Sequence, residues 1–112
     1  MALVRITGLP QAPLDAAAAF HAEWLPRLRA DLAAQEDEST VLVFPPADHS
    51  HRGWRLAAVQ ELARARAPRR VNALACDNED GLVAALGLLD NCQGVTGQLL
   101  AIDAAGMVEP QS

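Results

Sequence analysis

The sequence contains no lysine and no tyrosine, so all nine of its basic residues are arginines. A phosphate-binding P-loop and a Schiff-base mechanism both need a lysine, and no tyrosine is present to act as an acid or a nucleophile. Several large enzyme classes are thereby excluded. Cysteine is also scarce, because Cys76 and Cys92 are the only two and do not form a C-x-x-C pair. No disulfide framework is expected, which favours a reducing, cytoplasmic setting.

Excess basic charge and long apolar runs are missing as well. The formal net charge is −5 at pH 7, whereas nonspecific nucleic-acid binding needs an excess of basic charge to replace counterions. No apolar run approaches the roughly 18 residues of a membrane span, and the N-terminus lacks the basic-then-apolar order of a signal peptide. We therefore expect no nucleic-acid partner and no membrane span.

The length of 112 residues fits one compact domain. A chain of this size buries roughly two-thirds of its unfolded surface when it folds, so an ordinary core is available without disulfides or a structural metal.

Hydrophobic patterning predicts alternating strands and helices. Strands are expected at residues 2–7, 40–44, 70–75 and 98–103, and helices at residues 14–35, 53–67 and 79–90. Pro26 falls inside the first helix and is expected to kink or split it, whereas Asp77 or Asn78 can cap the third. The order β-α-β-α-β-α-β predicts an α/β fold, a three-layer sandwich around a four-stranded, mostly parallel sheet.

Two segments resemble the C-terminal half of the short-chain dehydrogenase/reductase family. Residues 70–75 read R-V-N-A-L-A, and residues 94–105 read G-V-T-G-Q-L-L-A-I-D-A-A. They are similar to the family's R-V-N-A-x-x-P-G strand and to its final x-T-G-Q-x-x-x-V-D-G-G strand. Leu25-Pro26 and residues 40–43 also resemble the family's fourth helix and fifth strand. The resemblance implies a truncated, degenerate member, with a single Rossmann-like domain at 1–105 and a flexible tail at 106–112.

The chain departs from the family pattern at each position that carries chemistry. The family's catalytic serine follows the fifth strand, where this sequence has Pro45-Pro46, and its Tyr-x-x-x-Lys lies near the start of the next helix, where His49, His51 and Trp54 stand. Thr7-Gly8 is not followed by the further glycines of a dinucleotide-binding turn. We therefore predict no catalytic residue and no bound nicotinamide cofactor.

One polar cluster, in the loop at residues 47–52, has residue types that catalysis uses. Four consecutive residues cannot form a triad among themselves, but Asp48, His49 and His51 have metal-ligand chemistry. A metal-dependent activity would need a third ligand, such as His21 or Asp77. The other interpretation is a solvated loop.

Six of the nine arginines fall between residues 52 and 70. They are Arg52, Arg55, Arg64, Arg66, Arg69 and Arg70. Such a strip has the chemistry to meet phosphate groups or an acidic partner, and a solvated helix face gives the same pattern.

Aromatic residues mark a candidate interface. In the resembled family the two longer helices pack against the same helices of a second subunit, and aromatic residues are enriched at interface cores. The candidate residues are Phe20, Trp24, Leu28, Trp54, Ala58 and Leu62. The alternative is that they pack under their own sheet.

The leading hypothesis is a noncatalytic dehydrogenase-like domain that acts as a structural or regulatory subunit. It would form a homodimer, or a heteromer with a full-length reductase, through its helices. An alternative is a subunit that completes the active site of a partner NAD(P)-dependent reductase.

Overall fold

A computed structural model describes residues 1–34, 38–102 and 108–111. The elements along the chain are β1 (Ala2–Arg5), α1 (Pro13–Ala19), the π-helical η1 (Phe20–Trp24), α2 (Leu25–Ala34), β2 (Ser39–Phe44), the 3-10 helix η2 (His49–His51), α3 (Arg52–Arg66), β3 (Arg70–Ala75), α4 (Glu79–Asn91), β4 (Leu99–Ile102) and β5 (Val108–Pro110). No helix among these residues is long and apolar enough to cross a membrane.

The strands form one sheet in the order β1-β2-β3-β4-β5. The first four are parallel, and the longest pairing joins β2 to β3 from Ser39 opposite Arg70 to Phe44 opposite Ala75. The predicted α/β fold with a mostly parallel sheet is thus confirmed. The sheet has five strands rather than four, because Val108–Pro110 pairs antiparallel with β4 where a tail was predicted. Residues 103–107 and 112 of the predicted last strand and tail, and Gln35 of the predicted first helix, lie outside the described residues.

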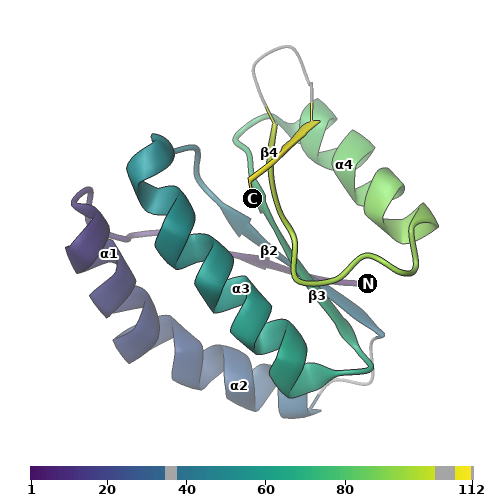
Figure 1. The fold of residues 1–112 in the computed structure, drawn as a ribbon, viewed down its shortest axis with the longest axis horizontal. Helices are drawn as coiled ribbons and strands as arrows, with labels where there is room; N and C mark the ends of the chain where they lie inside the picture. The colour runs from purple at the N-terminus through teal and green to yellow at the C-terminus, as the bar shows by residue number, and fades with distance from the viewer. Residues whose placement is uncertain (35–37, 103–107, 112) are drawn as a thin grey trace.

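Helices cover both faces of the sheet. Figure 1 shows α1, α2 and α3 on one side and α4 on the other. Two buried clusters match this arrangement, one between the sheet and η1, α2 and α3, and one between the sheet and α4. Every residue of β2 is buried because this strand lies under both layers. The predicted three-layer architecture is therefore present.

The third crossover differs from the first two in handedness. Strand order advances in one direction from β1 to β4, yet the helices before β3 cover one face while α4 covers the other. Parallel strands that advance the same way with their connecting helices on opposite faces have crossovers of opposite hand. Because about 98% of such crossovers are right-handed, general rules do not predict the position of α4.

The first long helix is divided at the place where Pro26 enters it. Five residues of π-helix, η1, separate α1 from α2, and Pro26 is the second residue of α2. A proline ring in a regular α-helix clashes with the carbonyl four residues earlier, and the wider π turn gives the ring room. The predicted split is therefore present and takes the form of a π-helical segment.

Candidate functional site

A cavity of about 390 Å³ opens at the carboxyl ends of β1 and β2. Its walls come from the loop after β1, from α1, from the loop after β2 and from the start of α3; the lining residues are Leu9, Pro10, Gln11, Ala16, Pro45, Pro46, Ala47, Asp48, His51 and Arg55. In open α/β sheets ligands bind in crevices outside the carboxyl ends of the strands. This cavity is therefore the candidate functional site.

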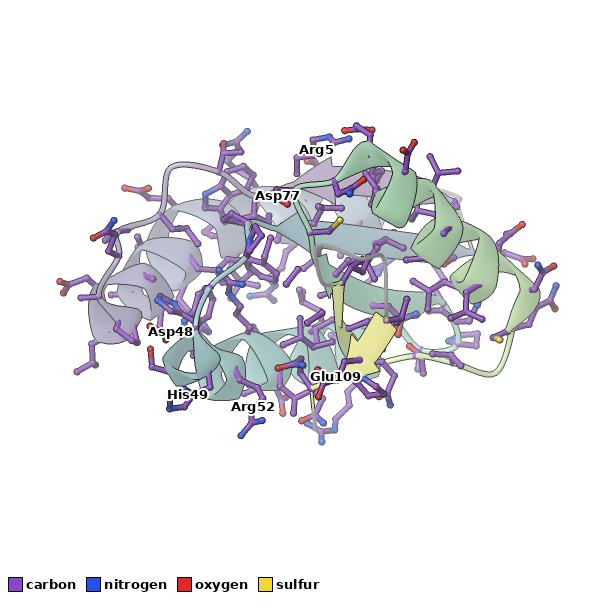
Figure 2. All side chains as sticks on the ribbon, turned by 90° about the horizontal axis from the view of Figure 1, so that it is seen from above. Arg5, Asp48, His49, Arg52, Asp77 and Glu109 are labelled. Atoms are coloured by element: carbon purple, nitrogen blue, oxygen red, sulfur yellow. The ribbon has the colours of Figure 1, made fainter. Side chains whose placement is uncertain are left out.

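The wall formed by the loop after β2 is shaped by Asp48. Asp48 caps η2, because its side chain accepts hydrogen bonds from the backbone N–H of Ser50 at 2.9 Å and from the Ser50 hydroxyl. These two bonds hold the pKa of the Asp48 carboxyl below its ordinary value. The helix α3 follows directly, and Figure 2 shows Asp48, His49 and Arg52 gathered at its start.

His51 is locked in place by both of its ring nitrogens. Nε2 lies 2.8 Å from the carbonyl oxygen of Gln11, and Nδ1 lies 3.1 Å from the indole Nε1 of Trp54. A carbonyl only accepts and an indole N–H only donates, so Nε2 carries the proton and Nδ1 accepts. The imidazole is 7% exposed and ties the loop before α1 to α3. Neither nitrogen is free to take a proton from a substrate.

Arg55 is the most buried charged residue of the cavity wall, with 5% of its surface exposed. Its Nη1 donates to the carbonyl of Pro45 at 2.9 Å, and its guanidinium lies 4.6 Å from the ring centre of Phe44 and 5.8 Å from that of Trp54. Its Nε is buried and has no hydrogen-bond partner among the described residues. Burial alone lowers the pKa of Arg55 to about 10.

Sequence reasoning missed Arg55 as a site residue because it grouped Arg55 with a strip of arginines. A usable signal was present: Arg55 stands three, four and seven residues before Ala58, Val59 and Leu62, which are all buried. That spacing places Arg55 on the inward face of α3. The interpretation of this position as part of a solvated helix face is therefore corrected.

Other arginines of the strip stabilise helix ends. Arg66 donates to the carbonyl of Leu32 near the end of α2, and Arg70 donates to the carbonyls of Leu89 and Cys92 at the end of α4. Cations favour helix C-termini because the last carbonyls are unpaired and carry partial negative charge. Arg69 lies 3.5 Å from the same Leu32 carbonyl, whereas Arg52 and Arg64 are exposed.

The metal site considered for the 48–51 loop is not formed by the described residues. His49 is exposed, Asp48 is held by Ser50 and both nitrogens of His51 are used. Asp77 lies away from Asp48 and His49 in Figure 2, and no described group of three or more His, Cys, Asp or Glu residues could hold a metal ion. The remaining candidate ligand, His21, is exposed on η1 and bonds to the carbonyl of Ala17.

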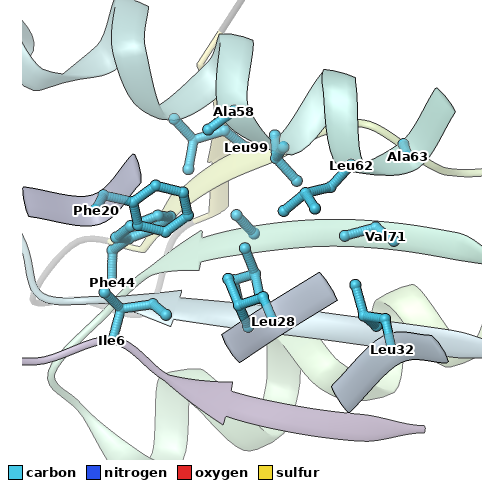
Figure 3. Packing of buried hydrophobic residues seen from close by; sticks show 13 residues of the cluster. Ile6, Phe20, Leu28, Leu32, Phe44, Ala58, Leu62, Ala63, Val71 and Leu99 are labelled. Carbon is cyan, nitrogen blue, oxygen red and sulfur yellow. The ribbon is translucent and has the colours of Figure 1, made fainter. Parts of the chain in front are cut away.

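Four of the six candidate interface residues belong to the core of this chain. Phe20, Leu28, Ala58 and Leu62 are between 0% and 6% exposed and pack together between the helices and the sheet (Figure 3). Side chains buried inside one chain are not available to a partner, so the alternative interpretation, packing under their own sheet, describes these four. Their spacing marks the inward faces of the helices.

The two tryptophans are only partly buried. Trp54 packs its ring against Phe20 and Phe44, with ring centres 5.4 Å and 5.6 Å away, and its indole N–H serves His51. Trp24 packs on the edge of the same cluster, and the guanidinium of Arg27 lies 4.8 Å from its ring centre. Both residues therefore contribute to the core as well as to the surface.

A known protein family matches this chain. The family described as short chain dehydrogenase-like protein matches residues 4–102, which is most of the chain. The chain therefore belongs to the short chain dehydrogenase-like family, as the R-V-N and T-G-Q segments predicted. No curated protein and no solved structure matches in the two other comparisons.

Membership of this family gives the cavity a context. The resemblance placed the Tyr-x-x-x-Lys pair near the start of the helix after the second predicted strand, and the structure has His51 and Arg55 there, at the same four-residue spacing and on the wall of one cavity. His51 is engaged on both sides, and Arg55 is a guanidinium whose charge is retained at neutral pH. The pair can bind and orient a ligand, but it offers no free acid or base.

Proposed function

We propose that this chain is a noncatalytic member of the short chain dehydrogenase-like family that acts as a structural or regulatory subunit by pairing with a second copy of itself. The observation that carries the noncatalytic part is the pair at the cavity wall. General acid catalysis needs a group that can give up a proton near the operating pH, and neither the doubly bonded His51 nor Arg55 provides one. The sequence has no tyrosine and no lysine to take that role.

The sheet supports the same proposal with regard to the cofactor. Dinucleotides bind doubly wound sheets at the point where the strand order reverses. Among the described residues the order runs from β1 to β4 without a reversal. The turn after β1 also has a single glycine, Gly8, before α1 begins at Pro13.

The pairing surface that we propose is the outward side of α2 and α3. A groove of about 240 Å³ runs between these helices, and its lining is mostly apolar; the residues are His21, Leu25, Arg29, Ala58, Glu61, Leu62 and Ala65. This surface overlaps only in part with the residues predicted from the sequence: the buried Ala58 and Leu62 form part of its lining, whereas Arg29, Glu61 and Ala65 are its exposed residues. Trp24 lies partly exposed at the start of this helix pair.

Charge distribution favours a second copy as the occupant of the groove. Arg29 on α2 and Glu61 on α3 line the two sides of the groove, and both are exposed. A two-fold axis through the groove places the Arg29 of each copy opposite the Glu61 of the other. Such an isologous contact is the commonest arrangement in homo-oligomers.

Sedimentation velocity of the purified chain tests the pairing. We expect a dimer that Ala65→Glu dissociates, because the new carboxylate lies in the groove beside Glu61. The double variant Arg29→Glu with Glu61→Arg exchanges the two charges, so residues 29 and 61 of the two copies remain oppositely charged and the dimer should persist. Leu14→Glu, which changes an 85% exposed residue on α1, is the matched control and should leave the dimer intact. A monomer at all concentrations, or a dimer that Ala65→Glu leaves unchanged, contradicts the proposed pairing.

Calorimetric titration with NADH and NADPH tests the noncatalytic part separately. We expect no binding tighter than about 100 μM, a free energy of roughly −5.5 kcal/mol, for either cofactor. Saturable binding below that limit contradicts the proposal, whatever the oligomeric state. The two experiments therefore fail independently.

A further inference from the structure

Arg55 carries a charge that the protein itself does not neutralise. Ion pairs between described residues join Arg5 to Glu79 and Arg64 to Glu61, whereas no described carboxylate is paired with Arg55. Its Nη1 donates to the neutral carbonyl of Pro45, and its Nε–H is buried without an acceptor among the described residues. A buried charge is usually paired, because an unpaired one loses its hydration without compensation. The edge of the guanidinium formed by Nε and Nη2 therefore lacks an acceptor.

The position of Arg55 on α3 increases the positive potential. Arg55 lies in the first turn of a 15-residue helix, which has no acidic residue in that turn. The N-terminus of a helix carries partial positive charge, so a cation there is repelled while an anion is attracted. Arg66 and Arg70 show the opposite arrangement at the carbonyl ends of helices. The start of α3 thus combines two positive sources, and no described carboxylate forms an ion pair with Arg55.

The cavity has the size and the rim for a small ligand. Its volume of about 390 Å³ falls within the range of small-molecule sites, roughly 300–1,000 Å³. Asp48 is the only carboxylate among the lining residues, and Ser50 keeps it ionised. A carboxylate only accepts hydrogen bonds, so it favours donors such as hydroxyl groups and disfavours a second negative charge.

We infer that this cavity binds a small hydroxylated ligand with a single anionic group, a carboxylate or a phosphate placed on Arg55, and with its hydroxyl groups toward Asp48. A guanidinium edge with two parallel N–H groups matches an oxyanion in a bidentate arrangement. Binding supplies the counter-charge that the described residues do not give Arg55. The rings of Phe44 and Trp54 hold the guanidinium in position before the ligand arrives. This inference stands apart from the proposed pairing, which uses the outward faces of α2 and α3.

A purely structural role is the competing explanation for Arg55. In that case the residue would tie α3 to the end of β2 through the Pro45 carbonyl, and anions would affect the protein only through ionic strength. The two explanations differ in one measurable respect. Only the binding site gives a saturable response that depends on the type of anion.

Isothermal calorimetry at constant ionic strength, with chloride as the background anion, makes that distinction. The probes are lactate and glycerol 3-phosphate as hydroxylated ligands, acetate and inorganic phosphate as simple oxyanions, and sodium chloride as the salt control. We expect lactate or glycerol 3-phosphate to bind saturably, at least threefold tighter than acetate or phosphate respectively. If lactate binds more tightly than glycerol 3-phosphate, the site prefers a carboxylate. The reverse order indicates a preference for a phosphate. No saturable binding by any of the four overturns the inference.

Two variants test whether the oxyanion ligands bind in this cavity. Arg55→Met should lower the affinity for the tightest-binding probe at least tenfold. Arg52→Met removes an exposed arginine from the same helical turn and should leave that affinity unchanged. Ala47→Trp narrows the cavity from its exposed wall while retaining Arg55, and it should also weaken binding at least tenfold. This second variant decides the question if Arg55→Met does not fold. Unchanged affinity in a folded Arg55→Met or Ala47→Trp protein overturns the inference.

Discussion

The arginines at the two ends of α3 have opposite electrostatic surroundings. At the C-terminal end Arg66 and the following Arg70 direct their guanidinium groups to the last carbonyls of α2 and α4. At the N-terminal end Arg55 is buried deeper than either, in the first turn, beside aromatic rings and without an ion pair to a described carboxylate. One set of arginines compensates partial charges that the fold creates, while Arg55 adds charge to an end that is already positive.

The difference shows how a structural arginine can be told from one that serves a ligand. The guanidinium groups of Arg66 and Arg70 donate to helix-end carbonyls, although the Nε of Arg66, like that of Arg55, is buried without a partner among the described residues. Arg55 differs because its carbonyl partner lies in a loop and because it stands near the positive end of its helix. In a native protein a buried donor without a partner is uncommon and needs an explanation. Matched substitutions at the two ends of α3 test this distinction.

The largest effect is expected from removing the aromatic support of Arg55. Phe44 is fully buried and packs against Phe20, Trp54 and the guanidinium of Arg55. Phe44→Ala should lower the free energy of unfolding by about 3–5 kcal/mol, through lost burial and the cavity that it leaves. Urea unfolding measures this change, and Leu14→Ala on the exposed side of α1 is the control. A loss below about 1 kcal/mol would mean that the rings do not support this end of α3.

Replacing arginine by methionine at each end compares the two roles directly. Arg70→Met removes the donor shared by two helix-end carbonyls and should cost about 1.5–3 kcal/mol, the range for hydrogen bonds to charged groups. Arg55→Met removes an unpaired buried charge and keeps the apolar stem, so stability without ligand should stay within about 1 kcal/mol or rise. Urea unfolding of both variants in the same buffer gives the answer. Equal losses would show that Arg55 is as structural as Arg70.

Glycines that flank α3 provide a smaller matched pair. Gly97 has a φ of 71° and packs against Gln60 and Ala63 on α3, so Gly97→Ala should cost about 1–2 kcal/mol for the left-handed backbone. Gly53 lies inside the first turn with open space beside it, and Gly53→Ala should gain about 0.5–1 kcal/mol. Thermal unfolding compares the two. A loss at Gly53 would show that this end of α3 needs a flexible first turn.

The smallest effect concerns the cap before α3. Hydrogen bonds from Ser50 lower the pKa of Asp48, so the ionised cap stabilises the fold above the unfolded pKa of 3.8 and loses this effect as pH falls through the lowered folded pKa. Asp48→Ala should therefore lower Tm slightly at about pH 7 and have no effect at about pH 2. Asp48→Asn, which still offers a carbonyl oxygen, should fall between the two proteins at neutral pH. A Tm difference that persists undiminished in acid would contradict this role.

Much of the fold could be predicted from the sequence because the central strands carry a strong signal. The strands predicted at residues 40–44 and 70–75 are present as β2 and β3, and Asn78, one of the two residues named as a possible cap of the third helix, accepts from the backbone N–H of Gly81. The strand at Val108–Pro110 was missed because three residues that include a proline give no periodic pattern. The placement of α4 depends on crossover handedness, which local sequence does not encode.

The candidate site was only partly predictable. Asp48 and His51 stood out as polar residues after a strand. In the folded chain Asp48 caps η2 through Ser50, and His51 links the loop before α1 to α3 through Gln11 and Trp54, which the sequence did not indicate. Arg55 was missed because arginine in a charged helix usually faces solvent. The candidate interface named inward-facing residues such as Phe20 and Leu62, because aromatic and aliphatic residues mark interfaces and cores alike.

The NMR signal of the Arg55 Nε–H tests the central claim most directly, because it reports on the donor that lacks an acceptor. The signal is assigned by its loss in Arg55→Met and followed while lactate or glycerol 3-phosphate is added at constant ionic strength. We predict a saturable shift with at least one of these ligands and none with chloride. A signal that stays in place with both ligands, or that moves equally with chloride, would contradict the claim that Arg55 is held ready for an oxyanion.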